Sequence, residues 1–172
     1  MKKLLVMMLV AILALGSTAF AATYTLDEDI TFEYDENAFE IANETKTDDE
    51  AVVVLNIKNA DWGEGFVLID LTDLEDGKTF PTLEEKQAEM QGVDVIQGDW
   101  ANFKNVLSFS TEEEGVTLSS FIVPIYDDDE PTKVEDVMSV VISVTKVDDE
   151  QAATDRDDAI SNLVDSLKVI DD

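Results

Sequence analysis

The sequence of 172 residues predicts an α+β fold in which helices cover an antiparallel β-sheet. Three observations indicate this class. Apolar residues recur with a period of two along much of the chain, which is typical of strands. Two other segments carry helical signals, and short acidic turns such as 111–115 favour antiparallel hairpins. Finally, several predicted strands are apolar on both faces, so we expect a covering layer on each side of the sheet.

The first half of the chain contains three alternating segments. The sets expected on one face of each strand are Ile30, Phe32 and Tyr34; Val53, Leu55 and Ile57; and Val67, Ile69 and Leu71. In the second and third segments the residues between these positions are also largely apolar. This pattern is expected of strands that are buried on both faces.

The second half predicts three further strands. The sets expected to share a face are Phe103, Leu107 and Phe109; Phe121, Val123 and Ile125; and Met138, Val140, Ile142 and Val144. Pro124 has no amide hydrogen to give to a neighbouring strand, so we expect an edge or a bulge near it.

Two helices are expected. Thr82 and Glu85 have the spacing of a capping box, which predicts a helix from Thr82 to about Gln91 that stops at Gly92. The second helix is expected to begin with Thr154 as its N-cap and acidic residues in its first turn. Its apolar residues lie three or four positions apart and predict one stripe that docks on the sheet: Ile160, Leu163, Val164 and Leu167.

Residues 1–21 have the pattern of a cleavable signal peptide. Lys2 and Lys3 precede an apolar run of about a dozen residues, and Ala19-Phe20-Ala21 matches the preference of signal peptidase. A membrane-spanning helix needs roughly 20 apolar residues, although an uncleaved anchor is the alternative. We therefore expect a secreted or extracytoplasmic protein, cleaved after about Ala21. Residues 22–172 would form a single acidic domain without membrane insertion.

The charge is strongly unbalanced, with 40 acidic residues, 11 basic residues and a net charge of −29. Such a field repels nucleic acid and anionic lipid, and it attracts cations and basic proteins. Three explanations stay open: solubility in a salty or crowded medium, a specific cation site, and a basic protein partner. The oligomeric state is also open.

The chain contains neither histidine nor cysteine. This excludes Ser-His-Asp and Cys-His catalysis, the common zinc sites and disulfides. A disulfide-free exported domain is more typical of bacteria than of the eukaryotic secretory route. No glycine-rich phosphate loop is present. We therefore predict no catalytic residue.

Clustered acids nevertheless predict a candidate calcium site, because Ca²⁺ takes six to eight oxygen ligands. The best candidate is the loop Asp127, Asp128, Asp129 and Glu130, which lies between two predicted strands and ends at Pro131. It does not match the spaced EF-hand pattern, so loosely condensed counterions are the alternative. Calcium is the one cofactor considered.

A carboxylate pair could also support glycoside hydrolysis, which needs two acids roughly 5–10 Å apart beside a sugar cleft. With 40 acids, such a spacing is expected by chance. Trp62 and Trp100 each lie next to an aspartate in a polar context and could stack on sugars. The alternative for both is packing over the margin of the core.

The order of elements resembles the PsbP-like family. The strand and aromatic-ended turn from Ile30 to Phe39, the helix from Thr82 to Gln91 and the closing segment Leu163 to Lys168 carry the resemblance. Asp35 and Phe39 stand where the family usually has proline and tryptophan. The resemblance implies an α-β-α sandwich around an antiparallel sheet and a non-catalytic binding or assembly role.

Together these features predict an exported, non-catalytic binding or structural module. The expected partner is an extracellular or envelope protein, with basic proteins favoured by the charge. A calcium-dependent extracellular module is the alternative, and a small glycan-acting hydrolase is the third possibility.

Overall fold

The computed structural model describes residues 21–27, 29–74, 78–127 and 129–170. Residues 1–20 of the predicted signal peptide and Asp128 of the predicted calcium loop lie outside these ranges. The described elements, in chain order, are β1 (Ala21–Leu26), β2 (Ile30–Asp35), β3 (Phe39–Lys46), β4 (Glu50–Ile57), the 3₁₀ turn η1 (Ala60–Trp62), β5 (Gly65–Asp73), α2 (Leu83–Glu89), β6 (Ile96–Trp100), β7 (Phe103–Glu113), β8 (Val116–Tyr126), β9 (Val134–Thr145), α3 (Glu150–Asp165) and β10 (Lys168–Val169).

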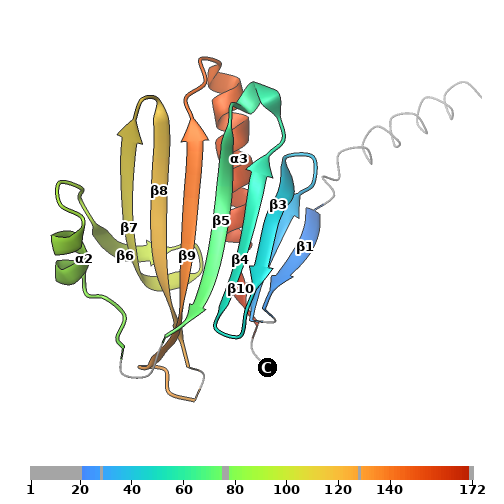
Figure 1. Ribbon diagram of the computed structural model, residues 1–172. Coiled ribbons are helices and arrows are strands. Elements are labelled where there is room, and N and C mark those ends of the chain that lie inside the picture. Colours follow the sequence, from blue (N-terminus) through green and yellow to red (C-terminus); the bar gives the residue numbers. More distant parts are fainter. Residues whose placement is uncertain (1–20, 28, 75–77, 128, 171–172) are drawn as a thin grey trace, which may run out of the picture.

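The described strands form two sheets. The larger has seven strands in the order β3-β4-β5-β9-β8-β7-β6, and every neighbouring pair is antiparallel. Its central strand, β9, pairs with β5 on one side and with β8 on the other (Figure 1). The strand that comes last in the sequence of this sheet therefore joins β3-β4-β5 to β8-β7-β6. The smaller sheet has the order β1-β2-β10.

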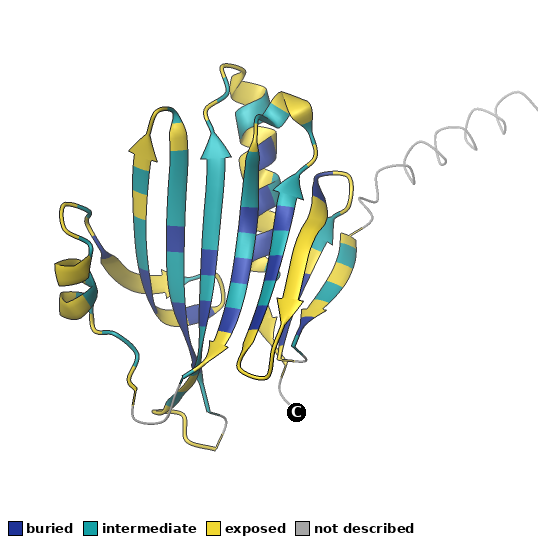
Figure 2. Ribbon diagram, viewed as in Figure 1, coloured by how far each residue is buried: buried dark blue, intermediate teal, exposed yellow. Residues whose placement is uncertain are grey.

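One face of the large sheet, which we call the back face, carries the core. The helix α3 and the small sheet lie against it (Figure 1). The helix contributes a buried apolar stripe, and β4, β5 and β9 contribute alternate residues, visible as alternating burial in Figure 2. The buried residues of this core include Phe32, Phe39, Leu55, Ile69, Met138, Val140, Ile160, Leu163, Val164 and Leu167.

The β6 end of the sheet curls round toward α3. Trp100 stacks on Phe121 with ring centroids 3.9 Å apart and planes inclined by 8°. Asn102, in the turn between β6 and β7, donates its side-chain amide to the carbonyls of Asp165 and Leu167 at 3.2 and 3.3 Å. Residues at the end of α3 are thereby tied to the sheet margin.

The structure confirms an α+β fold with mostly antiparallel sheets, but it is not a clear α-β-α sandwich. Of the two α-helices in the described residues, the longer one, α3, covers the back face together with the small sheet. The other helix, α2, has seven residues, none of them buried, and lies beside β7 at the sheet margin (Figure 1). It is too short and too polar to form a second layer. The described residues thus form an α+β fold with antiparallel sheets, and a helix-covered sheet describes it only loosely.

Two local predictions need correction. Phe103 belongs to the back-face core, whereas Leu107 and Phe109 lie on the opposite face, because Asn105 has a φ of 58° and shifts the alternation. The helix α3 begins at Glu150 rather than after Thr154, since Asp149 is its N-cap.

Other local predictions are confirmed. The capping box of Thr82 and Glu85 is formed, and Gly92 follows α2 with a φ of 84°. Pro124 sits beyond Ile122, the last β8 residue paired with β7, and next to a register shift at Ile125. Because β7 does not pair with β8 at Pro124, the proline needs no amide hydrogen on that side of the strand.

Candidate functional site

The face of the large sheet opposite α3, which we call the front face, carries apolar residues on several neighbouring strands. Cross-strand pairing identifies the residues that share it, since directly paired residues point to the same side. Phe66 and Leu118 both pair with Ser143 of β9, and Leu68 and Ser120 both pair with Val141. The front face thus continues across β5, β9 and β8.

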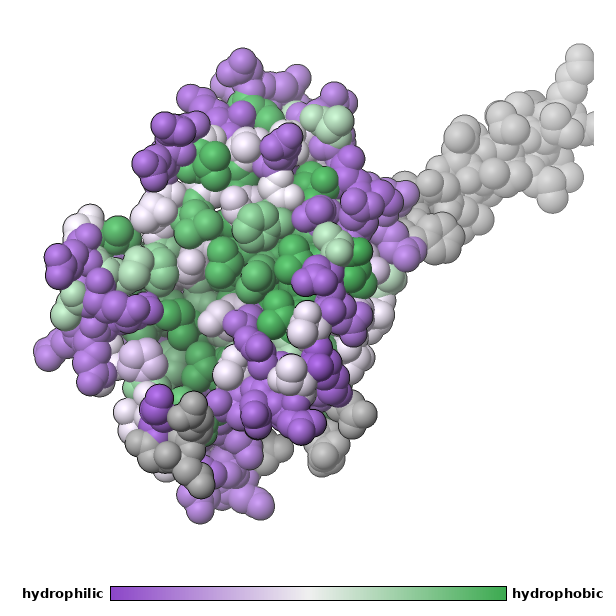
Figure 3. Space-filling model, in the orientation of Figure 1, coloured by the Kyte–Doolittle hydropathy of each residue, from purple (hydrophilic) through white to green (hydrophobic). Residues whose placement is uncertain are grey.

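Eight apolar side chains on this face form what we call the front-face cluster. All are half-buried, and none belongs to the back-face core: Val52, Val54, Phe66, Leu68, Leu118, Ile122, Val137 and Val141. Figure 3 shows hydrophobic surface over the middle of the sheet, framed by hydrophilic surface. Within the ranges that the structure describes, α2 is the one helix on this side, and it lies at the β7 margin (Figure 1). Contiguous exposed apolar patches of this kind mark interaction sites.

Small residues of β9 run down the middle of the cluster. Ser143 lies between Phe66 and Leu118. Four residues earlier along β9, Ser139 lies between Asp70 and Ile122. Large side chains on β5 and β8 therefore flank a line of smaller ones on β9.

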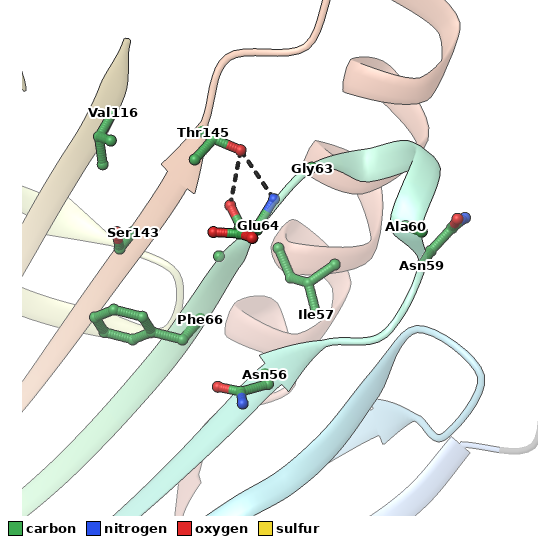
Figure 4. Close-up of a pocket in the computed structure, with 11 residues that line it drawn as sticks. Asn56, Ile57, Asn59, Ala60, Gly63, Glu64, Phe66, Val116, Ser143 and Thr145 are labelled. Atoms are coloured by element: carbon green, nitrogen blue, oxygen red, sulfur yellow. Dashed lines mark hydrogen bonds between the residues drawn. The ribbon is translucent and has the colours of Figure 1, made fainter. Parts of the chain in front are cut away.

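The surface is hollowed where this line reaches the end of the sheet. A depression of about 670 Å³ is lined by Asn56, Ile57, Asn59, Ala60, Gly63, Glu64, Gly65, Phe66, Val116, Ser143 and Thr145 (Figure 4). Val116 is itself 37% exposed. The depression thus extends the front-face cluster with both apolar and hydrogen-bonding groups.

The wall of the depression is fixed by a reciprocal contact. The hydroxyl of Thr145 accepts from the amide of Glu64 at 2.9 Å and donates to its carbonyl at 3.0 Å (Figure 4). Glycines on either side of Glu64 allow this close approach: a Cβ on Gly63 would lie 2.5 Å from Thr145 Oγ1, and one on Gly65 would overlap the Ser143 carbonyl.

Arg156 of α3 supports the same loop from behind. Its side chain is 7% exposed and donates to the carbonyls of Thr145 and Trp62 at 2.7 and 3.3 Å. Its Nε also donates to Asp157 at 2.9 Å. The guanidinium therefore joins α3 to two chain segments that border the depression.

Acidic residues lie on the margins of the front face. Pairing places Glu40 of β3, Glu50 of β4 and Glu113 of β7 on this side, all exposed. Asp70 of β5 lies further in and accepts from the hydroxyl of Thr72 at 3.0 Å. On the β7 side, Lys86 of α2 stands 5.9 Å from the ring centroid of Phe109. The apolar surface is thus framed mainly by negative charge.

The predicted calcium loop forms a turn between β8 and β9. A side-chain oxygen of Asp127 accepts from the amides of Asp129 and Glu130 at 2.8 and 3.0 Å. Its other oxygen pairs with Lys133 at 3.3 Å. These hydrogen bonds, the one from the Glu130 amide above all, lower the pKa of Asp127. Asp129 and Glu130 are exposed, and Asp128 lies outside the described ranges.

Acids from distant segments meet next to this loop. Asp29, Glu135 and Asp136 all line two adjoining depressions of about 350 and 420 Å³, and Asp73 lines the second. Burial, and then the charges of Asp73 and other acids, raise the pKa of Asp136 to about 6. Among the described residues no three acids are grouped so as to hold a metal ion. The calcium site and the carboxylate pair both stay predictions.

Both tryptophans pack against the margin of the core rather than standing free. Trp62 and Trp100 are partly buried against the back-face residues, and Trp100 is stacked on Phe121. These contacts match the alternative to sugar stacking.

The apolar residues of the front face are visible in the sequence as a second apolar set on two of the strands. Apolar residues on both faces of 52–57 and 66–71 predicted two covering layers. In the part of the chain that the structure describes, α3 and the small sheet cover one face, so the second set of residues stays partly accessible.

Comparisons with protein-family models, with curated proteins and with solved structures find no match to this chain. Over the part of the chain that the structure describes, no helix is long and apolar enough to cross a membrane.

Proposed function

We propose that this protein is an exported, non-catalytic binding module that holds a partner protein against the front face. The observation that carries the proposal is the front-face cluster, an apolar surface left accessible on an acidic molecule. An apolar surface of this kind is favourable to cover, at about 25 cal/mol for each Å² removed from water. The expected partner is an extracellular or envelope protein with basic residues, because the margins and the whole molecule are negative.

A rigid sheet surface would favour the binding of such a partner. The front-face strands β4, β5, β9 and β8 are all interior strands of one continuous ladder. Their positions are fixed on the other side by the back-face core, so the surface is preformed and loses little freedom on binding. We also propose that the α-β-α arrangement of the PsbP-like family is completed only in the complex. The bound partner would then supply the layer over the front face.

Site-specific photo-crosslinking in cells that export the protein tests the proposal. A benzoylphenylalanine at Leu68, in the middle of the cluster, is expected to give an adduct with another protein. The matched control is the same residue at Ile96 on β6, which is 65% exposed but outside the cluster. Adducts of equal yield at both positions, or adducts at Ile96 alone, would contradict the proposal.

A further inference from the structure

The backbone arrangement of the front face restricts what can bind there. Each of the strands β4, β5, β9 and β8 is paired on both sides, so their amide and carbonyl groups are used within the sheet. An extended segment lying on this face would find few partners for its own backbone groups, and unpaired buried groups are costly. A helix satisfies its backbone internally and has no such need.

The side chains also suit a helix. Ser139, Val141 and Ser143 of β9 form a line of smaller residues. Strand pairing places Phe66, Leu68 and Asp70 on its β5 side and Leu118, Ser120 and Ile122 on its β8 side, so four of these six neighbours are large and apolar. A helix with its side chains is about 10 Å wide, close to the span of three strands. On the back face, α3 docks on the core through an apolar stripe that includes Ile160 and Leu163. The same packing is available at the front.

The charges select the kind of helix. Glu40 and Glu50 lie on one side of the front face and Glu113 on the other, with Asp70 further in. A helix with an apolar stripe flanked by lysine or arginine would meet both the apolar centre and these acids. A second copy of this chain would instead bring like charges together, since the chain has 40 acidic residues against 11 basic ones.

We propose that the front-face cluster binds a cationic amphipathic α-helix of a partner protein, seated along β9 with its apolar stripe toward the sheet. This inference depends on the proposed function and specifies the chemistry of the partner. The bound helix would form the second layer that the doubly apolar strands β4 and β5 lack.

The test uses a fluorescent peptide of about 18 residues, about 27 Å of helix, in which leucines form one stripe and lysines flank it. Binding to the full protein is measured by anisotropy. Two control peptides separate the contributions: one has the same composition in an order that destroys the stripe, and one has glutamate in place of lysine. We expect the striped cationic peptide to bind at least tenfold more tightly than either.

Variants of the protein locate the binding. Leu68→Lys is expected to weaken binding at least tenfold, whereas Ile96→Lys, the same charge change outside the cluster, should change it less than twofold. Removing two marginal acids with Glu50→Gln and Glu113→Gln should weaken binding about threefold and reduce its salt dependence. The matched pair Glu33→Gln and Asp158→Asn, on exposed residues of β2 and α3, should have a smaller effect.

The outcomes separate the two proposals. Equal weakening by Leu68→Lys and Ile96→Lys would mean that the peptide does not bind the front face, and both proposals would fail. Equal binding of the glutamate or stripe-less peptide, abolished by Leu68→Lys, would overturn the cationic helix but leave the binding surface. Sedimentation could instead show that the protein is a dimer and that Leu68→Lys makes it a monomer. This result would mean that a second copy of the chain covers the front face, and it would overturn the inference.

Discussion

Arg156 is a buried charge whose hydrogen bonds join α3 to the ends of β9 and η1. Replacing it with methionine keeps most of the volume but leaves the carbonyls of Thr145 and Trp62 without this donor. We expect Arg156→Met to lower the free energy of unfolding by about 2–3 kcal/mol, as for lost hydrogen bonds to a charged group. Denaturant unfolding would measure the loss.

The control for this variant is Asp157→Asn, which removes the exposed partner of the same guanidinium; the Asp157 side chain is 64% exposed. Exposed ion pairs contribute about 0–1 kcal/mol, so the effect should be much smaller. Equal losses in the two variants would mean that the ion pair, and not the buried carbonyl contacts, holds the helix.

Asp136 predicts a pH dependence of stability. Its folded-state pKa of about 6 lies above the ordinary value of 3.8 for an aspartate, so the folded protein binds the proton more tightly than the unfolded chain. The contribution of this group to stability therefore increases as the pH falls from 7 to 4 and is lost as the pH rises through 6. Asp136→Asn should remove the repulsion at neutral pH.

Because the side chain is half-exposed and solvent screens it, we expect Asp136→Asn to raise the free energy of unfolding at pH 7 by about 1 kcal/mol. The gain should nearly vanish at pH 4. Unfolding curves at both pH values would check this, with Asp158→Asn on the exposed side of α3 as the control. A gain that is equal at both pH values would contradict the electrostatic cause.

At the scale of elements, the start of α3 gives a direct comparison between the sequence prediction and the structure. Asp149 accepts from the amides of Gln151 and Ala152 at 2.9 and 3.0 Å, whereas the hydroxyl of Thr154 donates to the carbonyl of Glu150 at 2.8 Å inside the helix. We expect Asp149→Ala to cost about 1 kcal/mol and Thr154→Ala much less. Thermal unfolding would distinguish them, and the reverse order would restore Thr154 as the N-cap.

The elements that were predicted correctly depend on local signals. Alternation identified the strands around Val53, Ile69 and Val140, and the capping box identified α2. The errors have local causes that the sequence does not display: Asn105 adopts a left-handed conformation and reverses the faces of β7, and several acids compete to cap α3. The pairing of β9 with β5, across about 70 residues, has no local signal.

At the scale of the whole molecule, the described residues cover one face of the large sheet, whereas the sequence predicts a layer on each face. Valines and leucines on both faces of β4 and β5 indicate that each face is favourable to cover, but a sequence does not show which chain covers it. Here the back face is covered by α3 and the small sheet, and the front-face cluster stays half-exposed. The β4 and β5 part of the candidate site therefore consists of residues that the sequence predicts to be buried: Val52, Val54, Phe66 and Leu68.

The most direct test of the binding surface compares neighbouring residues on the same strands. We would titrate the striped cationic peptide into protein with labelled valine and leucine methyl groups and record chemical-shift changes by NMR. The predicted result is that Val52, Val54 and Leu68 shift, while Val53, Leu55 and Val67, which alternate with them but face the core, do not. Shifts concentrated on the core-facing set or on α3, or no shifts at all, would contradict the account.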